Sequence, residues 1–176
     1  DAHARSDGAR LEEDPGLVAD DAWKTENIGE GWFEGDTVNM SIGQGFLLAT
    51  PLQVALMNAV PANGGYLVQP HLLKDNPEAK KNRRSVGLSK DALKVLQSGL
   101  RQVVTSGTGQ VMNVPTIPPN AGKTGTAEDP PRLSHAWYGG YAPYDKPEIV
   151  VVVFGQNSGG GGGGFARWLG TGPRRR

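Results

Sequence analysis

The first stretch with a helical pattern is apolar on almost every side. Thr50 supplies an N-cap, Pro51 suits the first turn, and Gln53 completes a capping box with Thr50. Because the residues that follow leave almost no polar face, we expect this helix to be buried. Pro61 should kink or end it, and the Asn-Gly-Gly sequence at 63–65 supplies the stop.

A second helix is predicted from an amphipathic pattern later in the chain. Ser89 supplies its N-cap, and the glycine-containing residues 106–109 end it. Its apolar positions recur at helical spacing and form one stripe, so we expect one face to pack on a core: Leu93, Leu96, Leu100, Val103 and Val104.

Short apolar and aromatic runs in the rest of the chain predict strands. The first is Tyr66–Val68, and the others cover residues 123–127, 136–141 and 149–154. The run at 149–154 has no polar position, so we expect that strand to be buried on both faces. A short turn at 142–147 joins the last two strands into an antiparallel hairpin. Helices first and a meander last indicate an α+β fold, an antiparallel sheet with packed helices.

Polar and glycine-rich segments surround this pattern. Residues 1–22 are charged and lack apolar periodicity, which favours an irregular lead-in or linker. Residues 23–33 combine tryptophans with glycines and acidic residues, which suggests a loop anchored by its aromatic side chains. Residues 158–176 contain a glycine run and end in arginines, so we expect a disordered tail and one domain at 23–157. Residues 75–84 read as a solvated connection with a basic cluster: Lys80, Lys81, Arg83 and Arg84.

The composition excludes several kinds of site. None of the 176 residues is cysteine, which rules out disulfides, thiolate zinc sites and a cysteine nucleophile. Lys plus Arg equals Asp plus Glu at 18 each, so the charge gives no argument for a nucleic-acid partner. No run approaches the roughly 20 apolar residues of a membrane helix. The histidines are scattered, and we expect neither a metal site nor a cofactor: His3, His71 and His135.

One short stretch, Lys123-Thr124-Gly125-Thr126, carries residues suited to chemistry. An amine, two hydroxyls and a glycine on a predicted strand can bind the carboxylate at the end of a peptide. Gly125 lets another backbone approach closely, and a free strand edge can pair with an extended peptide. On a regular strand Lys123 and Gly125 face one way and the two threonines the other. Alone, a Lys-Thr-Gly triplet fits an ordinary turn equally well.

Other segments around this stretch follow the order seen in a known family. They are residues 35–39, 41–45, 49–53, 63–65, 69–71, 121–128 and 140–143. Lys-Thr-Gly itself is one of three boxes of the serine penicillin-binding proteins and β-lactamases. Over about residues 14–163 the chain resembles the class B penicillin-binding proteins, the peptidoglycan D,D-transpeptidases. Residues 135–137 and the glycine run after Phe154 look most like the elongation transpeptidase group, penicillin-binding protein 2.

This resemblance implies an extracytoplasmic enzyme, anchored to the bacterial cell membrane by an N-terminal segment, with the serine penicillin-binding-protein and β-lactamase-like fold. It implies peptidoglycan stem peptides as substrates, β-lactams as ligands and an elongation glycosyltransferase as partner. Lys123 would bind the terminal carboxylate and shape the proton network. Thr124 and Thr126 would offer hydroxyls to that carboxylate, and the Thr126 N–H would form half of the oxyanion hole.

The family's nucleophile is a serine in a Ser-x-x-Lys box, and neither this box nor Ser-x-Asn occurs in the chain. Thr37-Val38-Asn39 has similar spacing to Ser-x-Asn but belongs to a different matched segment. We expect both boxes upstream of Asp1 in the intact protein, and no acyl-enzyme from this chain alone. Two alternatives stay open: a serine β-lactamase or D,D-carboxypeptidase relative, and a non-catalytic penicillin- or peptide-binding module.

Overall fold

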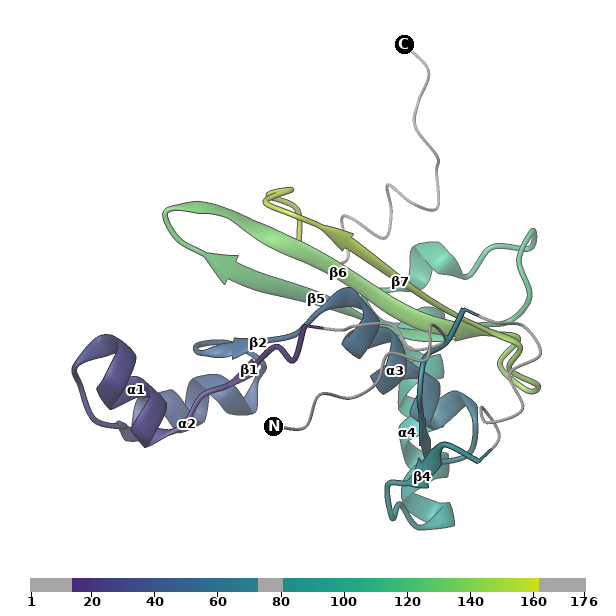
Figure 1. Ribbon diagram of the computed structural model, residues 1–176. Helices are drawn as coiled ribbons and strands as arrows, with labels where there is room; N and C mark the ends of the chain where they lie inside the picture. Colours follow the sequence, from purple (N-terminus) through teal and green to yellow (C-terminus); the bar gives the residue numbers. More distant parts are fainter. Residues whose placement is uncertain (1–13, 73–80, 162–176) are drawn as a thin grey trace.

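The computed structural model describes residues 14–72 and 81–161, and an antiparallel sheet of three strands dominates it (Figure 1). The strands lie in the order β5 (Ala121–Asp129), β6 (Arg132–Ala142) and β7 (Ile149–Gly155). Two short antiparallel ladders accompany it: β1 (Leu17–Val18) with β2 (Leu47–Leu48), and β3 (Tyr66–Val68) with β4 (Arg83–Ser85). The helices of the described residues are α1 (Asp21–Ile28), α2 (Glu34–Ser41), α3 (Pro51–Ala62), α4 (Lys90–Thr105) and the 3-10 turn η1 (Gln110–Met112).

The main sheet is the meander that the sequence predicts. β6 is its central strand, with Tyr138 opposite both Thr124 on β5 and Val153 on β7. α3 packs against β6 and β7, whereas α4 packs against β5. In Figure 1, α1, α2 and the β1–β2 ladder lie to one side of this body, beneath the far end of β5. Helices packed on an antiparallel sheet confirm the α+β fold.

α3 begins as the sequence predicts. The Thr50 hydroxyl accepts a hydrogen bond from Gln53 N at 3.1 Å, and Gln53 Oε1 accepts one from Thr50 N at 2.9 Å. The expectation of a buried helix is wrong for part of its surface, because Met57 is 63% exposed. A continuously apolar sequence does not tell which face will lack a neighbour. Pro61 is buried inside the last turn, and the helix ends one residue later, at Ala62. Because Pro61 has no N–H, it cannot donate to the carbonyl of Met57, and only this one bond near the end of the helix is lost.

α4 confirms the second helix prediction. Its N-cap is Ser89, whose Oγ accepts a hydrogen bond from Ala92 N at 3.1 Å, and its C-cap is Ser106. The apolar stripe is not buried evenly. Val104 is completely buried, whereas Leu96 is 41% exposed. The C-terminal half of α4, which leads towards the candidate site, therefore packs more closely than the N-terminal half.

Residues 23–33 were expected to form a loop. This prediction is wrong for residues 23–28, which belong to α1, and is confirmed for residues 29–33. The Asp20 carboxylate accepts a hydrogen bond from Trp23 N at 2.8 Å and starts α1. Gly29, with φ of 83°, ends it in the left-handed conformation. An N-cap aspartate and a left-handed glycine are sufficient boundaries for a short helix. α2 follows after the loop at 29–33, and its first turn is fixed by the Asp36 carboxylate, which accepts a hydrogen bond from Phe33 N at 2.8 Å.

β7 is not buried on both faces, contrary to the prediction from its apolar sequence. Ile149 is 57% exposed and Val151 is 45% exposed. Val151 pairs with Gly140, the neighbour of Gly139, whose Cβ position faces Asn58 of α3. Val151 and Ile149 therefore lie on the face of the sheet that α3 does not cover. The burial of a strand depends on what lies beside it, and the strand's own sequence does not contain that information.

Two polar segments are more regular than expected. The described part of residues 1–22 contains β1 and the start of α1, so it is not an irregular lead-in. Residues 83 and 84, expected as part of a solvated connection, belong to β4 (Arg83–Ser85), although their side chains are exposed as predicted. Lys80, His3 and most of the predicted tail at 158–176 lie outside the described residues.

Candidate functional site

The four residues singled out by the sequence lie together in the first half of β5. Lys123 pairs with Gly139, Thr124 with Tyr138, Gly125 with Trp137 and Thr126 with Ala136. β6 thus occupies one edge of this stretch. No other strand of the described residues pairs with β5, so its second edge faces outward.

The two faces of β5 have different neighbours. Residues paired across the ladder share a face, and adjacent residues alternate. Gly139 pairs with Lys123 and therefore shares its face. A Cβ built on Gly139 would lie 2.5 Å from Nδ2 of Asn58, a residue of α3, so α3 packs against the face that carries Lys123. Thr124 lies on the opposite face, where its hydroxyl shares a hydrogen bond of 2.5 Å with the Thr108 hydroxyl. The alternation predicted for Lys123 and Thr124 is therefore present in the structure.

Thr124 is buried, with 6% of its surface exposed. Its hydroxyl meets Thr108 in the loop that follows α4. Since only one hydrogen of the two hydroxyls lies between them, the other remains for a further acceptor. The carboxylate role of Thr124 stays a prediction, and the structure gives this residue a direct link to the end of α4.

Lys123 has an exposed side chain that turns back along the strand. Its Nζ donates a hydrogen bond to Thr124 O at 2.6 Å. The ammonium group therefore lies close to the backbone of β5, where it gives this part of the strand a positive charge. If a carboxylate bound here, it would replace the Thr124 carbonyl as the acceptor for Lys123 Nζ. A charged carboxylate forms a stronger hydrogen bond with an ammonium group than a neutral carbonyl does.

Gly125 and Thr126 complete the stretch. A Cβ on Gly125 would lie 3.3 Å from Trp137 Cβ, which is closer than an ordinary contact. Trp137 stacks with Phe154 at 4.2 Å between ring centroids. Thr126 is exposed, and a Cβ on Gly161 would lie 3.5 Å from its Oγ1. The glycine thus allows the aromatic pair to pack closely against β5 on the side that Lys123 shares.

The far end of the β5–β6 hairpin is held by a cluster around Asp129. Its carboxylate accepts hydrogen bonds from Arg132 Nη2 at 3.0 Å and from Asn157 Nδ2 at 2.9 Å. Hydrogen bonds from Arg132, followed by those from Asn157, hold the pKa of Asp129 below its usual range. His135 Nδ1 accepts a hydrogen bond from Asn157 N at 2.9 Å. This cluster keeps the segment after β7 beside the hairpin.

Gln44 also belongs to the site, and the sequence analysis did not select it as a functional residue. Its Nε2 donates a hydrogen bond to Thr126 O at 3.1 Å, and its Oε1 accepts one from Glu128 N at 3.3 Å. Gln44 lies in the turn between α2 and β2, next to Gly43 and Gly45. The available signal was its position inside the matched segment 41–45, but a glutamine between glycines does not reveal its partner.

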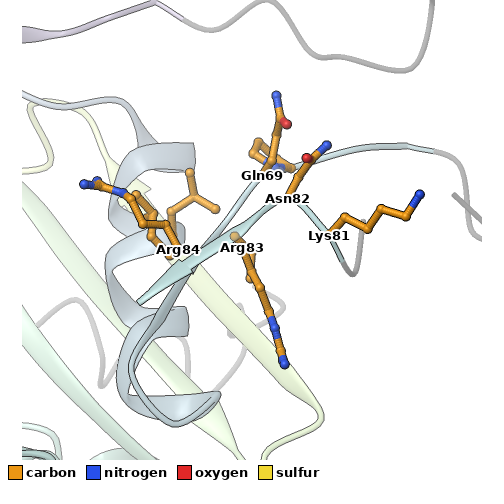
Figure 2. Close-up of a pocket in the computed structure, with 9 residues that line it drawn as sticks. Gln69, Lys81, Asn82, Arg83 and Arg84 are labelled. Atoms are coloured by element: carbon orange, nitrogen blue, oxygen red, sulfur yellow. The ribbon is translucent and has the colours of Figure 1, made fainter. Parts of the chain in front are cut away.

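A hollow of about 460 Å³ lies elsewhere, beside the β3–β4 ladder (Figure 2). Figure 2 shows the Lys81, Arg83 and Arg84 side chains pointing in different directions rather than towards one point. Because the cations do not converge, the hollow does not form a built anion site. It contains none of the predicted site residues. Its remaining lining comes from Leu56, Leu67, Val68, Gln69, Pro70 and Asn82.

Residues 12–167 match the family model of the penicillin binding protein transpeptidase domain. The chain belongs to this family. The transpeptidase domain is 34% identical over 171 residues to the peptidoglycan D,D-transpeptidase MrdA of Acinetobacter baumannii, an alignment that covers 82% of this chain and 25% of the relative. The chain thus spans about a quarter of the length of that relative.

Solved structures agree with this assignment. The domain superposes on Pseudomonas aeruginosa PBP2, crystallised in complex with WCK 5153, with a TM-score of 0.76 and 31% identity, covering 92% of this chain and 38% of that one. It also superposes on a chain of a peptidoglycan synthase complex, with a TM-score of 0.72 and 40% identity, covering 92% and 28%. The predicted membership of the penicillin-binding-protein fold is confirmed. No helix within 14–72 or 81–161 is long and apolar enough to cross a membrane.

Proposed function

We propose that this chain provides the carboxylate-binding strand of a peptidoglycan D,D-transpeptidase that cross-links stem peptides through a serine acyl-enzyme. The observation that carries the proposal is β5 itself, with Lys123 and Thr126 along a strand that has one edge facing outward. The family assignment and the names of the relatives support the reaction type. Nothing in the proposal requires a metal or an organic cofactor.

Thr126 has the backbone orientation that an oxyanion hole needs. In an antiparallel ladder the N–H and C=O groups of one residue point to the same edge. Thr126 O is bonded to Gln44, away from β6, so the Thr126 N–H faces the outer edge as well. There it can donate to the carbonyl oxygen of a peptide as negative charge develops on that oxygen. This geometry supports the role predicted for the Thr126 backbone.

Lys123 and the threonine hydroxyls would hold the other end of the substrate. In the proposed reaction a serine oxygen attacks the penultimate D-alanine carbonyl, and the terminal D-alanine leaves as its amine takes up a proton. An acceptor amine then replaces the serine. The carboxylate of the leaving residue needs a cation and hydroxyl donors, and we propose Lys123 and the exposed Thr126 hydroxyl for these roles. Thr124 is buried, so its hydroxyl would have to turn away from Thr108 in order to contribute. The same groups would bind the carboxylate of a β-lactam.

The attacking serine is not present here in a Ser-x-x-Lys box. We therefore propose that the chain binds the peptide terminus without forming a covalent intermediate. A relative forms part of a peptidoglycan synthase complex, which supports a glycosyltransferase partner for the intact protein. An extracytoplasmic position and an N-terminal membrane anchor belong to the same proposal.

The test uses the full chain and a peptide ending in D-Ala-D-Ala. In ¹⁵N-correlation spectra the peptide should shift the amides of residues 123–126, and Lys123→Ala should weaken binding at least about tenfold through loss of a charged hydrogen bond. Lys146→Ala, an exposed lysine in the β6–β7 turn, is the matched control and should bind like the unaltered chain. Equal binding by Lys123→Ala would contradict the assigned site.

Fluorescent penicillin provides the complementary measurement. We expect no covalent adduct with the chain, because an acyl-enzyme requires the serine nucleophile. A stable adduct would contradict this expectation and show that another side chain of the chain acts as the nucleophile. A non-catalytic peptide-binding module is the alternative to a transpeptidase. That candidate would be supported if the intact protein also bound the peptide but never formed an adduct.

A further inference from the structure

The chain folds back against the β5–β6 hairpin after β7, in a stretch that we call the docked segment (residues 157–161). Its first residue donates from Asn157 N to His135 Nδ1 at 2.9 Å. Two residues later, Gly159 N donates to Ser134 O at 3.2 Å. Two neighbouring residues of β6 thus hold the docked segment on the hairpin.

Asn157 is the residue at which the chain turns. Its φ of 46° lies in the left-handed region, which asparagine adopts more readily than most other residues. Its side-chain Nδ2 donates to Leu133 O at 2.6 Å and to Asp129 Oδ2 at 2.9 Å. Because its backbone and its side chain both bond to the hairpin, the start of the docked segment is fixed.

The bond between Asn157 and His135 requires a neutral imidazole. The Asn157 N–H can only donate, so His135 Nδ1 must be without a proton, and the ring proton is on Nε2, 3.5 Å from Asp129 Oδ2. The ring packs edge-on against Phe154, with 5.3 Å between ring centroids. The charged groups that face it within 14–72 and 81–161 are Asp129 and Arg132, which form an ion pair of 2.8 Å. Protonation of Nδ1 would set two N–H groups against each other and break the bond to Asn157.

The other end of the docked segment lies beside the candidate site. A Cβ on Gly161 would lie 3.5 Å from Thr126 Oγ1. Apart from the immediate chain neighbours of Gly161, no other described residue comes within 4 Å of that point. The Thr126 hydroxyl is one of the groups proposed to bind the peptide carboxylate. Gly161 therefore places backbone next to this hydroxyl and leaves open the space that a side chain would fill.

We propose that the docked segment forms one wall of the carboxylate site beside Thr126, and that His135 and Asn157 are positioning residues that hold this wall while His135 is neutral. The lack of a side chain at Gly161 leaves room for the carboxylate between the wall and β5. The identity of the ligand rests on the proposed function, whereas the docking rests on the hydrogen bonds between the segment and β6.

The docking is tested without a peptide, by amide hydrogen exchange in the full chain over about pH 5 to 8, with each rate divided by that of an unstructured peptide. Asp129 stays ionised over this range, because hydrogen bonds from Arg132 and Asn157 hold its pKa below the usual value. Protection of the Asn157 and Gly159 amides should therefore fall towards acid pH, as His135 becomes protonated. Protection that does not change with pH would overturn the role of the neutral imidazole.

Two variants separate this role from a merely structural one. His135→Leu removes the acceptor, so the protection of Asn157 should drop by about tenfold at neutral pH. His135→Asn places an amide oxygen near the position of Nδ1, where it can accept but cannot be protonated. In that variant the protection should be retained and should no longer depend on pH. Equal losses in the two variants would overturn the assignment of His135.

The wall is tested with a stem pentapeptide ending in D-Ala-D-Ala. Gly161→Ala should weaken binding at least about fivefold, because the new methyl group occupies the space beside Thr126, and it should leave the protection of Asn157 unchanged. Gly31→Ala is the matched control in the loop between α1 and α2. Its Cβ would lie 3.5 Å from Asp21 Oδ1, and it should bind like the unaltered chain.

The outcomes distinguish the wall from the proposed function. Equal binding by Gly161→Ala, in a chain whose binding is lost in Lys123→Ala, would overturn the wall and leave the proposed function standing. Failure of the unaltered chain to bind the peptide would overturn both. The protection of Asn157 would judge the docking separately in either case.

Discussion

Gly139 is a position where one added methyl group should disturb both the packing of α3 and the strand opposite the candidate site. A Cβ on Gly139 would lie 2.5 Å from Asn58 Nδ2 and 3.1 Å from Asn58 Cγ. Asn58 is buried, and its Nδ2 donates to Val54 O at 2.8 Å, so it cannot move away without losing that hydrogen bond. Since Gly139 pairs with Lys123, any shift of β6 reaches the proposed carboxylate site.

We expect Gly139→Ala to lower the free energy of unfolding by about 2–4 kcal/mol. Overpacking a dense interior costs about 1–3 kcal/mol, and a buried amide left without its partner costs about 1–3 kcal/mol. In a chain of this size each kcal/mol corresponds to about 2–4 °C in melting temperature. Urea and thermal unfolding, followed by circular dichroism, should therefore show a fall of roughly 5–15 °C.

Two further variants separate this clash from a general effect of replacing glycine. Gly35→Ala, in α2, meets no atom within 4 Å, and it should leave stability unchanged or raise it slightly. Asn58→Ala removes the obstructing amide, so the new methyl of Gly139→Ala can occupy the vacated space. The double variant should be at least about 1 kcal/mol more stable than the sum of the single effects predicts. Strictly additive effects, or an unaltered melting temperature in Gly139→Ala, would refute the reasoning.

Two predictions concern titration. The hydrogen bonds that lower the pKa of Asp129 stabilise the folded chain above the unfolded pKa of about 4, and their effect is lost as the pH falls through the lower folded value. Urea unfolding across the acid range should show this loss, and Asp129→Asn should diminish it; identical pH profiles would contradict the assignment. Burial raises the pKa of Tyr138 and that of Tyr141 to about 12. Ultraviolet titration should find two of the four tyrosines ionising only near that pH, and Tyr138→Phe should remove one of them, whereas ionisation of all four near pH 10 would argue against their burial.

The parts of the fold that the sequence predicts correctly depend on residues close together in the chain. Thr50 and Ser89 cap their helices through partners three residues away, and the pattern of the main strands is similarly local. α1 shows that a local signal can be present and still be overlooked. Asp20 and Gly29 mark its two ends, although the tryptophans and glycines of residues 23–33 suggest a loop.

The features that the sequence does not predict depend on distant segments. Thr108 and Thr124 meet through their hydroxyls only because α4 packs against β5. The exposure of Val151 depends on which helix covers its face of the sheet. Gln44 reaches β5 across more than 80 residues of sequence. In each case the residue type permits the contact but does not specify the partner.

The outer edge of β5 has two physical requirements that conflict. A peptide can bind there only if backbone groups are available, yet an open strand edge also invites pairing with other chains. Lys123 places a charged group on the Thr124 carbonyl. On the proposed function, a peptide carboxylate can draw Lys123 away because it is the stronger acceptor, whereas a neutral strand from another copy cannot. The edge would then open for a peptide that ends in a carboxylate and remain closed to other extended segments.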